Sequence, residues 1–179
     1  GLGSDPNSVL LVSEDAHSSF IKCTRIMGLN ESNLVRIKTD NNGCMDMQNL
    51  RKTLDKCFID NKKIFAIVAT LGTTVRGAID PIKDISEICK ERNIWLHIDG
   101  SIGGIFAVTS IPIEGLNNIN QANSITINPQ KIIGITKTSS LLLVSEMSTL
   151  ENTFSTGLPY LSSNEAVSYT HLTLPTMLP

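Results

Sequence analysis

The segment Ile94-Trp-Leu-His-Ile-Asp-Gly-Ser-Ile-Gly-Gly104 joins a short apolar stretch to a polar, glycine-rich turn. Residues 94–98 have the length and composition of a buried β-strand, and Asp99 follows them directly. Short apolar runs of this kind recur along the chain. The other predicted strands are residues 9–12, 34–37, 64–69, 124–127 and 141–144.

Segments with helical periodicity separate several of these strands. Apolar residues at helical spacing predict a helix over residues 18–27, which Gly28 ends. Asp46 suits the N-cap of a second helix, and Pro81 opens a third at its first turn. The residues predicted to face the core are Leu50, Leu54, Cys57 and Phe58 of the second helix and Ile82, Ile85, Ile88 and Cys89 of the third. This alternation predicts an α/β fold with a mostly parallel sheet and helices on both faces.

The composition is that of a globular protein. Of the 179 residues, 41% are hydrophobic and 18% are charged, which argues against a disordered chain. The formal net charge is −2 and no basic stripe is present, so we expect no nucleic-acid partner. No apolar run approaches the ~20 residues that span a bilayer, so we expect no membrane partner.

The four cysteines are Cys23, Cys44, Cys57 and Cys89. They form no C-x-x-C pair and have no histidine at the spacing of a metal site, so we expect no metal. We interpret them as reduced thiols, with Cys57 and Cys89 in the core. The first residues lack the charged start and apolar stretch of a signal peptide. These features together predict a cytoplasmic protein.

Polar clusters follow four of the predicted strands. They are Ser13-Glu-Asp-Ala-His17, Thr70-Leu-Gly-Thr-Thr74, Asp99 with the glycines after it, and Asn128-Pro-Gln-Lys131. Ligands of open α/β sheets bind outside the carboxyl ends of the strands, so we expect these clusters to lie at one edge. They supply an imidazole, hydroxyls, a carboxylate, an amide and an amine.

This set of groups suits an aldehyde cofactor. A lysine forms a Schiff base with pyridoxal phosphate, and an aspartate pairs with the pyridinium nitrogen. Asp99 lies between an isoleucine and a glycine, so we expect it to be largely buried and to need a partner. A protonated pyridinium is such a partner. The alternative is that Asp99 only caps the turn after its strand.

Residues 17–144 resemble the group II pyridoxal-phosphate-dependent decarboxylases, which include the aromatic amino acid and glutamate decarboxylases. The resemblance is carried, in order, by four motifs. They are Asp15-Ala-His17-Ser-Ser-Phe-Ile-Lys22, Ala69-Thr-Leu-Gly-Thr-Thr74 with Asp80-Pro81, Trp95-Leu-His97-Ile-Asp99, and Asn128-Pro-Gln-Lys131. The resemblance implies part of the large domain of the fold-type I pyridoxal-phosphate enzymes.

The resemblance also implies roles for individual residues. Lys131 would hold the cofactor as an internal aldimine, and Asp99 would pair with the pyridinium nitrogen. His17 would stack on the ring and help to position the substrate. These three are the catalytic residues that the resemblance implies.

Further residues would surround the cofactor by the same resemblance. Thr74, with Thr73 beside it, would support the cofactor and Asp99. Asn128 would lie near the phosphate. His97 would orient its neighbours through hydrogen bonds or have a purely structural role.

Two positions depart from the family pattern. The family usually has Ala-Ala after the aspartate, where this chain has Gly100-Ser101, so Ser101 is expected to hydrogen-bond to the cofactor or to substrate. The family usually has His before the lysine, where this chain has Gln130, a predicted cofactor contact that cannot titrate. These departures bear on substrate and reaction specificity and leave the cofactor prediction unchanged.

The expected reaction is decarboxylation of an L-amino acid to its amine and carbon dioxide. Residues 1–163 are predicted to be the central part of the cofactor-binding domain of a larger, homodimeric enzyme. We expect the 179 residues alone to be inactive. Residues 164–179 show no sustained periodicity and are predicted to be a non-native or disordered tail.

Other functions are compatible with the same residues. Another fold-type I enzyme, such as an aminotransferase or a carbon–carbon lyase, would share Lys131 and Asp99, because a fold does not determine a reaction. A non-catalytic relative is conceivable because of Gly100 and Gln130. A nucleotide-binding Rossmann domain fits poorly, since residues 100–104 do not form G-x-G-x-x-G.

Overall fold

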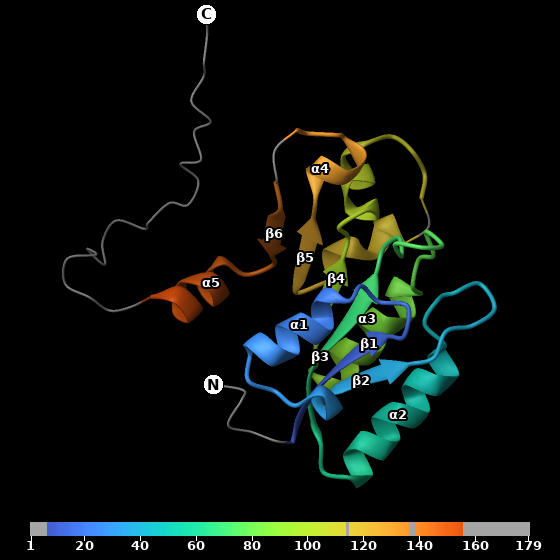
Figure 1. Cartoon of the computed structure of the whole chain (residues 1–179), viewed down its shortest axis with the longest axis vertical. Coiled ribbons are helices and arrows are strands. Elements are labelled where there is room, and N and C mark those ends of the chain that lie inside the picture. The colour runs from blue at the N-terminus through green and yellow to red at the C-terminus, as the bar shows by residue number, and fades with distance from the viewer. Residues whose placement is uncertain (1–6, 114, 137–138, 156–179) are drawn as a thin grey trace, which may run out of the picture. The chain divides into compact units, whose positions relative to one another are not determined.

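The computed structural model describes residues 7–113, 115–136 and 139–155, and the chain divides into two units. The first unit, Gly1–Ser145, contains a sheet with its helices (Figure 1). The second unit, Glu146–Pro179, contains helix α5 (Met147–Phe154). The predicted tail at residues 164–179 lies outside the described residues.

The sheet of the first unit has six strands in the order β2-β1-β3-β4-β5-β6. The strand bounds are β1 Ser8–Ser13, β2 Leu34–Ile37, β3 Lys63–Thr70, β4 Trp95–Asp99, β5 Ser124–Ile127 and β6 Leu141–Val144. Neighbours from β2 to β5 pair in parallel, whereas β6 runs antiparallel to β5. Five strands therefore end at the same edge, as the mostly parallel sheet predicted from the sequence requires.

Helices cover both faces of this sheet. The bounds are α1 Ser19–Ile26, α2 Met47–Ile59, α3 Ile82–Arg92 and α4 Pro129–Ile132, with 3-10 helices η2 Glu31–Asn33, η3 Gly103–Val108 and η4 Leu116–Gln121. On one face, residues of α2 and α3 share an apolar cluster with Leu11 and Ile67 of the sheet. On the other face, Phe20 of α1 packs against a cluster that includes Leu10 and Val68. The predicted α/β layering is confirmed.

Local signals explain where the helices begin and end. The Asp46 side chain accepts hydrogen bonds from the backbone N–H groups of Gln48 and Asn49, at 2.7 and 2.9 Å, and caps α2 as predicted. Gly28 follows the end of α1 with a φ of +73°, a conformation that favours glycine. Asn93 ends α3 in the same left-handed region.

The predicted inward faces of α2 and α3 are buried with one exception. The residues confirmed as buried are Leu50, Leu54, Cys57, Ile82, Ile85, Ile88 and Cys89. The prediction for Phe58 is wrong, because this side chain is 83% exposed. Eight residues after Leu50, it is rotated by roughly 80° around the helix and lies beyond the buried stripe. Burial raises the pKa of the Cys89 thiol to about 12, so Cys89 packs as an uncharged residue.

Strand β6 is the least buried strand of the sheet. Leu141, Leu142 and Leu143 are 46%, 54% and 50% exposed. Their apolar run is as strong as that of the central strands, but β6 lies at the edge of the described sheet and has a strand on one side only.

Candidate functional site

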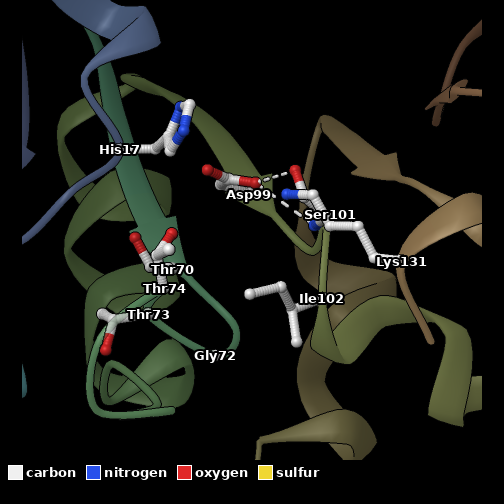
Figure 2. A pocket seen from close by; sticks show the side chains of 9 residues that line it. All are labelled: His17, Thr70, Gly72, Thr73, Thr74, Asp99, Ser101, Ile102 and Lys131. Atoms are coloured by element: carbon white, nitrogen blue, oxygen red, sulfur yellow. Dashed lines mark hydrogen bonds between the residues drawn. The ribbon is translucent and has the colours of Figure 1, made fainter.

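A pocket lies at the edge where the parallel strands end. Its lining residues are His17, Thr70, Gly72, Thr73, Thr74, Asp99, Ser101, Ile102 and Lys131 (Figure 2). They come from the ends of β3 and β4, from the segments after β1, β3 and β4, and from α4. The polar clusters that were expected at one edge therefore meet there, and six of the nine predicted site residues line the pocket.

Strand register places two of the lining residues side by side. Thr70 at the end of β3 pairs with Asp99 at the end of β4. The Leu71 N–H donates to the Asp99 carbonyl oxygen at 2.9 Å, which extends the ladder past the strand ends. Thr70 is 4% exposed and Asp99 is 8% exposed, so both polar side chains are buried.

Asp99 is a buried carboxylate, and its hydrogen-bond partner among the described residues, Ser101, is uncharged. Its Oδ1 accepts hydrogen bonds from the Ser101 backbone N–H at 3.2 Å and from the Ser101 hydroxyl. None of the ion pairs in the described ranges includes Asp99. Removing a carboxylate from water is costly unless it is paired, so this end of the pocket favours a ligand that carries positive charge.

Lys131 reaches the pocket from the short helix α4. Pro129 is buried at the first position of this helix, and the Lys131 N–H donates to the Asn128 carbonyl oxygen at 3.0 Å. Figure 2 shows the Lys131 side chain directed toward Asp99 and Ser101. The turn at the end of β5 thus presents a primary amine on the same side of the pocket as Ser101.

His17 lines the pocket from the segment after β1. Its Nδ1 accepts the Ser19 backbone N–H at 3.2 Å and lies 2.9 Å from the Ser19 hydroxyl oxygen. Because Nδ1 is the acceptor, the neutral ring carries its hydrogen on Nε2. These two contacts with Ser19 orient the imidazole.

Three predicted site residues lie outside the lining of the pocket. Asn128 accepts a hydrogen bond from the Ser140 hydroxyl at 2.7 Å, and Gln130 accepts one from the Ser139 hydroxyl at 3.4 Å. Both amides therefore brace the chain that follows α4. His97 lies two residues before Asp99 on β4 and faces the same side of the sheet.

A hydrogen-bonded chain holds His97 behind the pocket. The Trp95 Nε1–H donates to the Ser124 hydroxyl oxygen at 2.9 Å, and the same hydroxyl lies 2.8 Å from Nδ1 of His97. The other ring nitrogen lies 3.4 Å from the Thr126 hydroxyl. Burial lowers the pKa of His97 from its usual value, although the nearby Asp99 charge acts in the opposite direction. His97 is thus a neutral link between β4 and β5.

Three lining residues were not predicted as site residues: Thr70, Gly72 and Ile102. The Thr70 hydroxyl is buried and has no hydrogen-bond partner among the described residues. Such a group is rare in folded proteins and points to a missing ligand or water. The alternation of side chains between the two faces of a strand could have indicated Thr70. Thr70 lies two residues after Val68 on one face of β3, just as Asp99 lies two residues after His97 on β4.

Asp80 holds the loop that carries Gly72, Thr73 and Thr74. Its two carboxylate oxygens accept the backbone N–H groups of Met45 and Thr70, each at 2.7 Å. Burial raises the pKa of Asp80 to about 6, and the two backbone hydrogen bonds only partly oppose this shift.

Asp80→Asn is expected to destabilise the fold by about 2 kcal/mol or more at pH 5, because its amide NH₂ faces a backbone N–H. Between pH 3.8 and about 6, folded Asp80 binds a proton that the unfolded chain has released. The unfolding free energy of the wild type therefore falls as pH rises through this window. The variant lacks this dependence, so its deficit is about 1 kcal/mol larger at pH 5 than at pH 7.

Urea unfolding of both proteins at pH 5 and pH 7 measures this difference. Asp60→Asn on the exposed end of α2 is the control and should change stability little at either pH. An Asp80→Asn deficit that is equal at the two pH values would contradict the assignment.

Comparison with known proteins identifies the family. The sequence model of the pyridoxal-dependent decarboxylase conserved domain matches residues 5–177. The chain belongs to this family. Acidic amino acid decarboxylase GADL1 of Mus musculus is 34% identical over 150 residues, which cover 84% of this chain and 27% of that protein. The chain spans about a quarter of the length of the curated relatives it matches.

Solved structures of pyridoxal-dependent decarboxylases share the fold. Mouse CSAD has a TM-score of 0.76 and 28% identity, over 84% of this chain and 32% of that chain. Catharanthus roseus tryptophan decarboxylase, solved with L-tryptophan, has a TM-score of 0.76 and 26% identity, over 84% of this chain and 33% of that chain. The predicted fold, part of the large domain of such an enzyme, is confirmed.

Pyridoxal phosphate is the cofactor of this family, and the pocket fits it chemically. Lys131 offers an amine for the aldehyde, and the uncompensated Asp99 charge suits a pyridinium nitrogen. The unpartnered Thr70 hydroxyl is a further polar group left for a ligand. The cavity that these side chains leave is about 10 Å³, far below the roughly 300–1,000 Å³ of most ligand pockets, so the lining side chains have to move apart for the cofactor to enter.

Proposed function

We propose that the protein is a pyridoxal-phosphate-dependent decarboxylase that converts an L-amino acid to its amine and carbon dioxide. The observation that carries the proposal is the meeting of Lys131, Asp99 and His17 around one pocket, in a chain of this family. Pyridoxal phosphate, when bound, accepts into its ring the electron pair of the bond that breaks. The chain's own residues bind the cofactor, orient it and balance its charge.

Lys131, Asp99 and His17 divide this work. Lys131 would be the covalent anchor of the cofactor, through its side-chain amine. Asp99 would place a negative charge near the ring nitrogen, and its burial would strengthen the attraction between opposite charges. His17 would present its imidazole, with the hydrogen on Nε2, to the ring and the substrate.

The remaining predicted residues shape the site. Thr73 accepts the Ala78 N–H at 3.0 Å through its hydroxyl and so closes the turn that presents Thr74 to the pocket. Asn128 and Gln130 act through the segment after Lys131, and His97 acts through the strand that ends in Asp99.

The proposal extends to a cytoplasmic homodimer with an amino acid as substrate. The exposed leucines of β6 support burial of this edge by further protein, since large exposed apolar patches are rare on soluble monomers. Within the described residues, no helix has the length and apolar character needed to cross a bilayer. The names of the relatives include both acidic and aromatic amino acid decarboxylases, so the substrate side chain is best found by screening.

The proposal is tested in two steps. The larger enzyme that the proposal expects around this chain is first incubated with pyridoxal phosphate, reduced with borohydride and digested, and the modified peptide is expected to contain Lys131. Release of labelled carbon dioxide and formation of amine are then measured across a panel of carboxyl-labelled L-amino acids. Keto acid formation without carbon dioxide would show an aminotransferase instead, and absence of any reducible adduct would indicate a non-catalytic relative.

A further inference from the structure

Ser101 has a hydrogen-bond partner within the chain that the sequence did not indicate. The expected hydrogen bond to the cofactor or to substrate stays a prediction. In the structure, the Ser101 hydroxyl donates to Oδ1 of Asp99, and the Ser101 backbone N–H donates to the same oxygen at 3.2 Å. A single residue therefore supplies both hydrogen bonds that the Asp99 carboxylate receives from the described residues.

The two carboxylate oxygens of Asp99 are thereby made unequal. Oδ1 accepts two hydrogen bonds, whereas none of the described hydrogen bonds reaches Oδ2. Figure 2 shows the second oxygen directed away from Ser101, on the side of His17. Oδ2 is thus the oxygen that remains for a positively charged group in the pocket.

The turn that positions Ser101 is fixed by the backbone. Gly100 donates its N–H to the Ile98 carbonyl oxygen at 3.0 Å, and the Gly104 N–H donates to the Gly100 carbonyl oxygen at 2.8 Å. A Cβ at Gly100 would lie 3.0 Å from the Thr126 carbonyl oxygen, so the turn packs tightly on β5. The backbone position of Ser101 is therefore set by the fold, within reach of the Asp99 carboxylate.

We infer that Ser101 is a positioning residue that weakens the hold of Asp99 on the ring nitrogen of pyridoxal phosphate. This inference rests on the proposed function. A hydrogen bond to a carboxylate stabilises its charge, and charge engaged at Oδ1 is less available to a donor at Oδ2. Relatives with alanine at this position lack the hydroxyl and would hold the ring proton more firmly.

The consequence is a ring nitrogen that loses its proton more readily than in those relatives. Less positive charge on the ring means weaker withdrawal of electrons from the substrate. Ser101 thereby adjusts the electron demand of the cofactor without touching the reacting bond. The adjacent glycine and the serine act together, since the tight turn at Gly100 places Ser101 within reach of Asp99.

The test is ¹⁵N NMR of the holoenzyme loaded with pyridoxal phosphate labelled at the ring nitrogen. In Ser101→Ala, the ratio of protonated to unprotonated ring nitrogen is expected to rise by about tenfold, the effect of one hydrogen bond to a charged group. The resonance therefore moves toward that of a protonated pyridine. Ser101→Thr keeps a hydroxyl and should reproduce the wild-type resonance.

Ser101→Cys provides a second measurement, because a thiol is a weak donor of similar shape, and its resonance should lie between those of Ser and Ala. Equal resonances in the wild type, Ser101→Ala and Ser101→Cys would overturn the inference while leaving the proposed function intact. Failure of the wild type to form the reducible adduct on Lys131 would overturn both.

Discussion

Lys131→Ala is expected to abolish the borohydride-reducible attachment of pyridoxal phosphate to this chain. The Lys131 amine lines the same pocket as Asp99, and alanine leaves no nucleophile at that position. Decarboxylation by the holoenzyme should fall by about a thousandfold or more, as for other groups that act directly in the chemistry. Mass spectrometry of the reduced, digested protein measures the adduct.

Two further variants distinguish the covalent role of the Lys131 amine from the effect of its positive charge. Lys131→Arg keeps the positive charge but offers no amine, so it should also lose the adduct. Lys90→Ala removes an exposed lysine from α3 and should keep the adduct on Lys131. A reduced adduct that persists at the wild-type level in Lys131→Ala would place the anchor on another lysine.

Gly103→Ala is expected to lower the unfolding free energy by about 3 kcal/mol, at the upper end of the usual cost of overpacking. A Cβ at this position would lie 2.5 Å from the Leu71 carbonyl oxygen, which itself accepts the Gly103 N–H at 2.9 Å. Both groups belong to backbone, so neither can turn aside as a flexible side chain would. Urea unfolding followed by circular dichroism measures the loss.

Gly77→Ala is the control for this substitution. Gly77 has a φ of +66°, and a Cβ there would meet nothing within 4 Å. Its replacement therefore adds only the left-handed strain of about 1 kcal/mol. If Gly103→Ala lowers the unfolding free energy no more than Gly77→Ala does, the predicted clash between a Cβ at position 103 and the Leu71 carbonyl oxygen is wrong.

Much of this fold could be predicted from the sequence because its strands are short apolar runs of low ambiguity. The run at residues 64–69 is buried toward its end, and Asp46 caps its helix with the predicted chemistry. The antiparallel direction of β6 could not be predicted from the sequence. Residues 141–144 have the same apolar character as a buried parallel strand, and only the pairing with β5 shows an antiparallel edge.

The sequence predicted which segments meet at the candidate site. It did not predict the hydrogen bonds between the residues of the site. The rule that ligands bind at the carboxyl ends of strands brought Asp99 and Lys131 to one edge. The partner of Ser101 depends on the geometry of a tight turn, and the isolation of the Thr70 hydroxyl depends on strand register. Neither follows from residue type.

The hydrogen bonds that link Trp95, Ser124 and His97 allow the site to be monitored by tryptophan fluorescence. Trp95 is the only tryptophan of the 179 residues, and its indole nitrogen is joined through the Ser124 hydroxyl to the histidine beside Asp99. Within these 179 residues, tryptophan emission therefore comes from a single side chain, on the strand that ends at the pocket. Cofactor loading can be followed through quenching of this emission, without any attached dye.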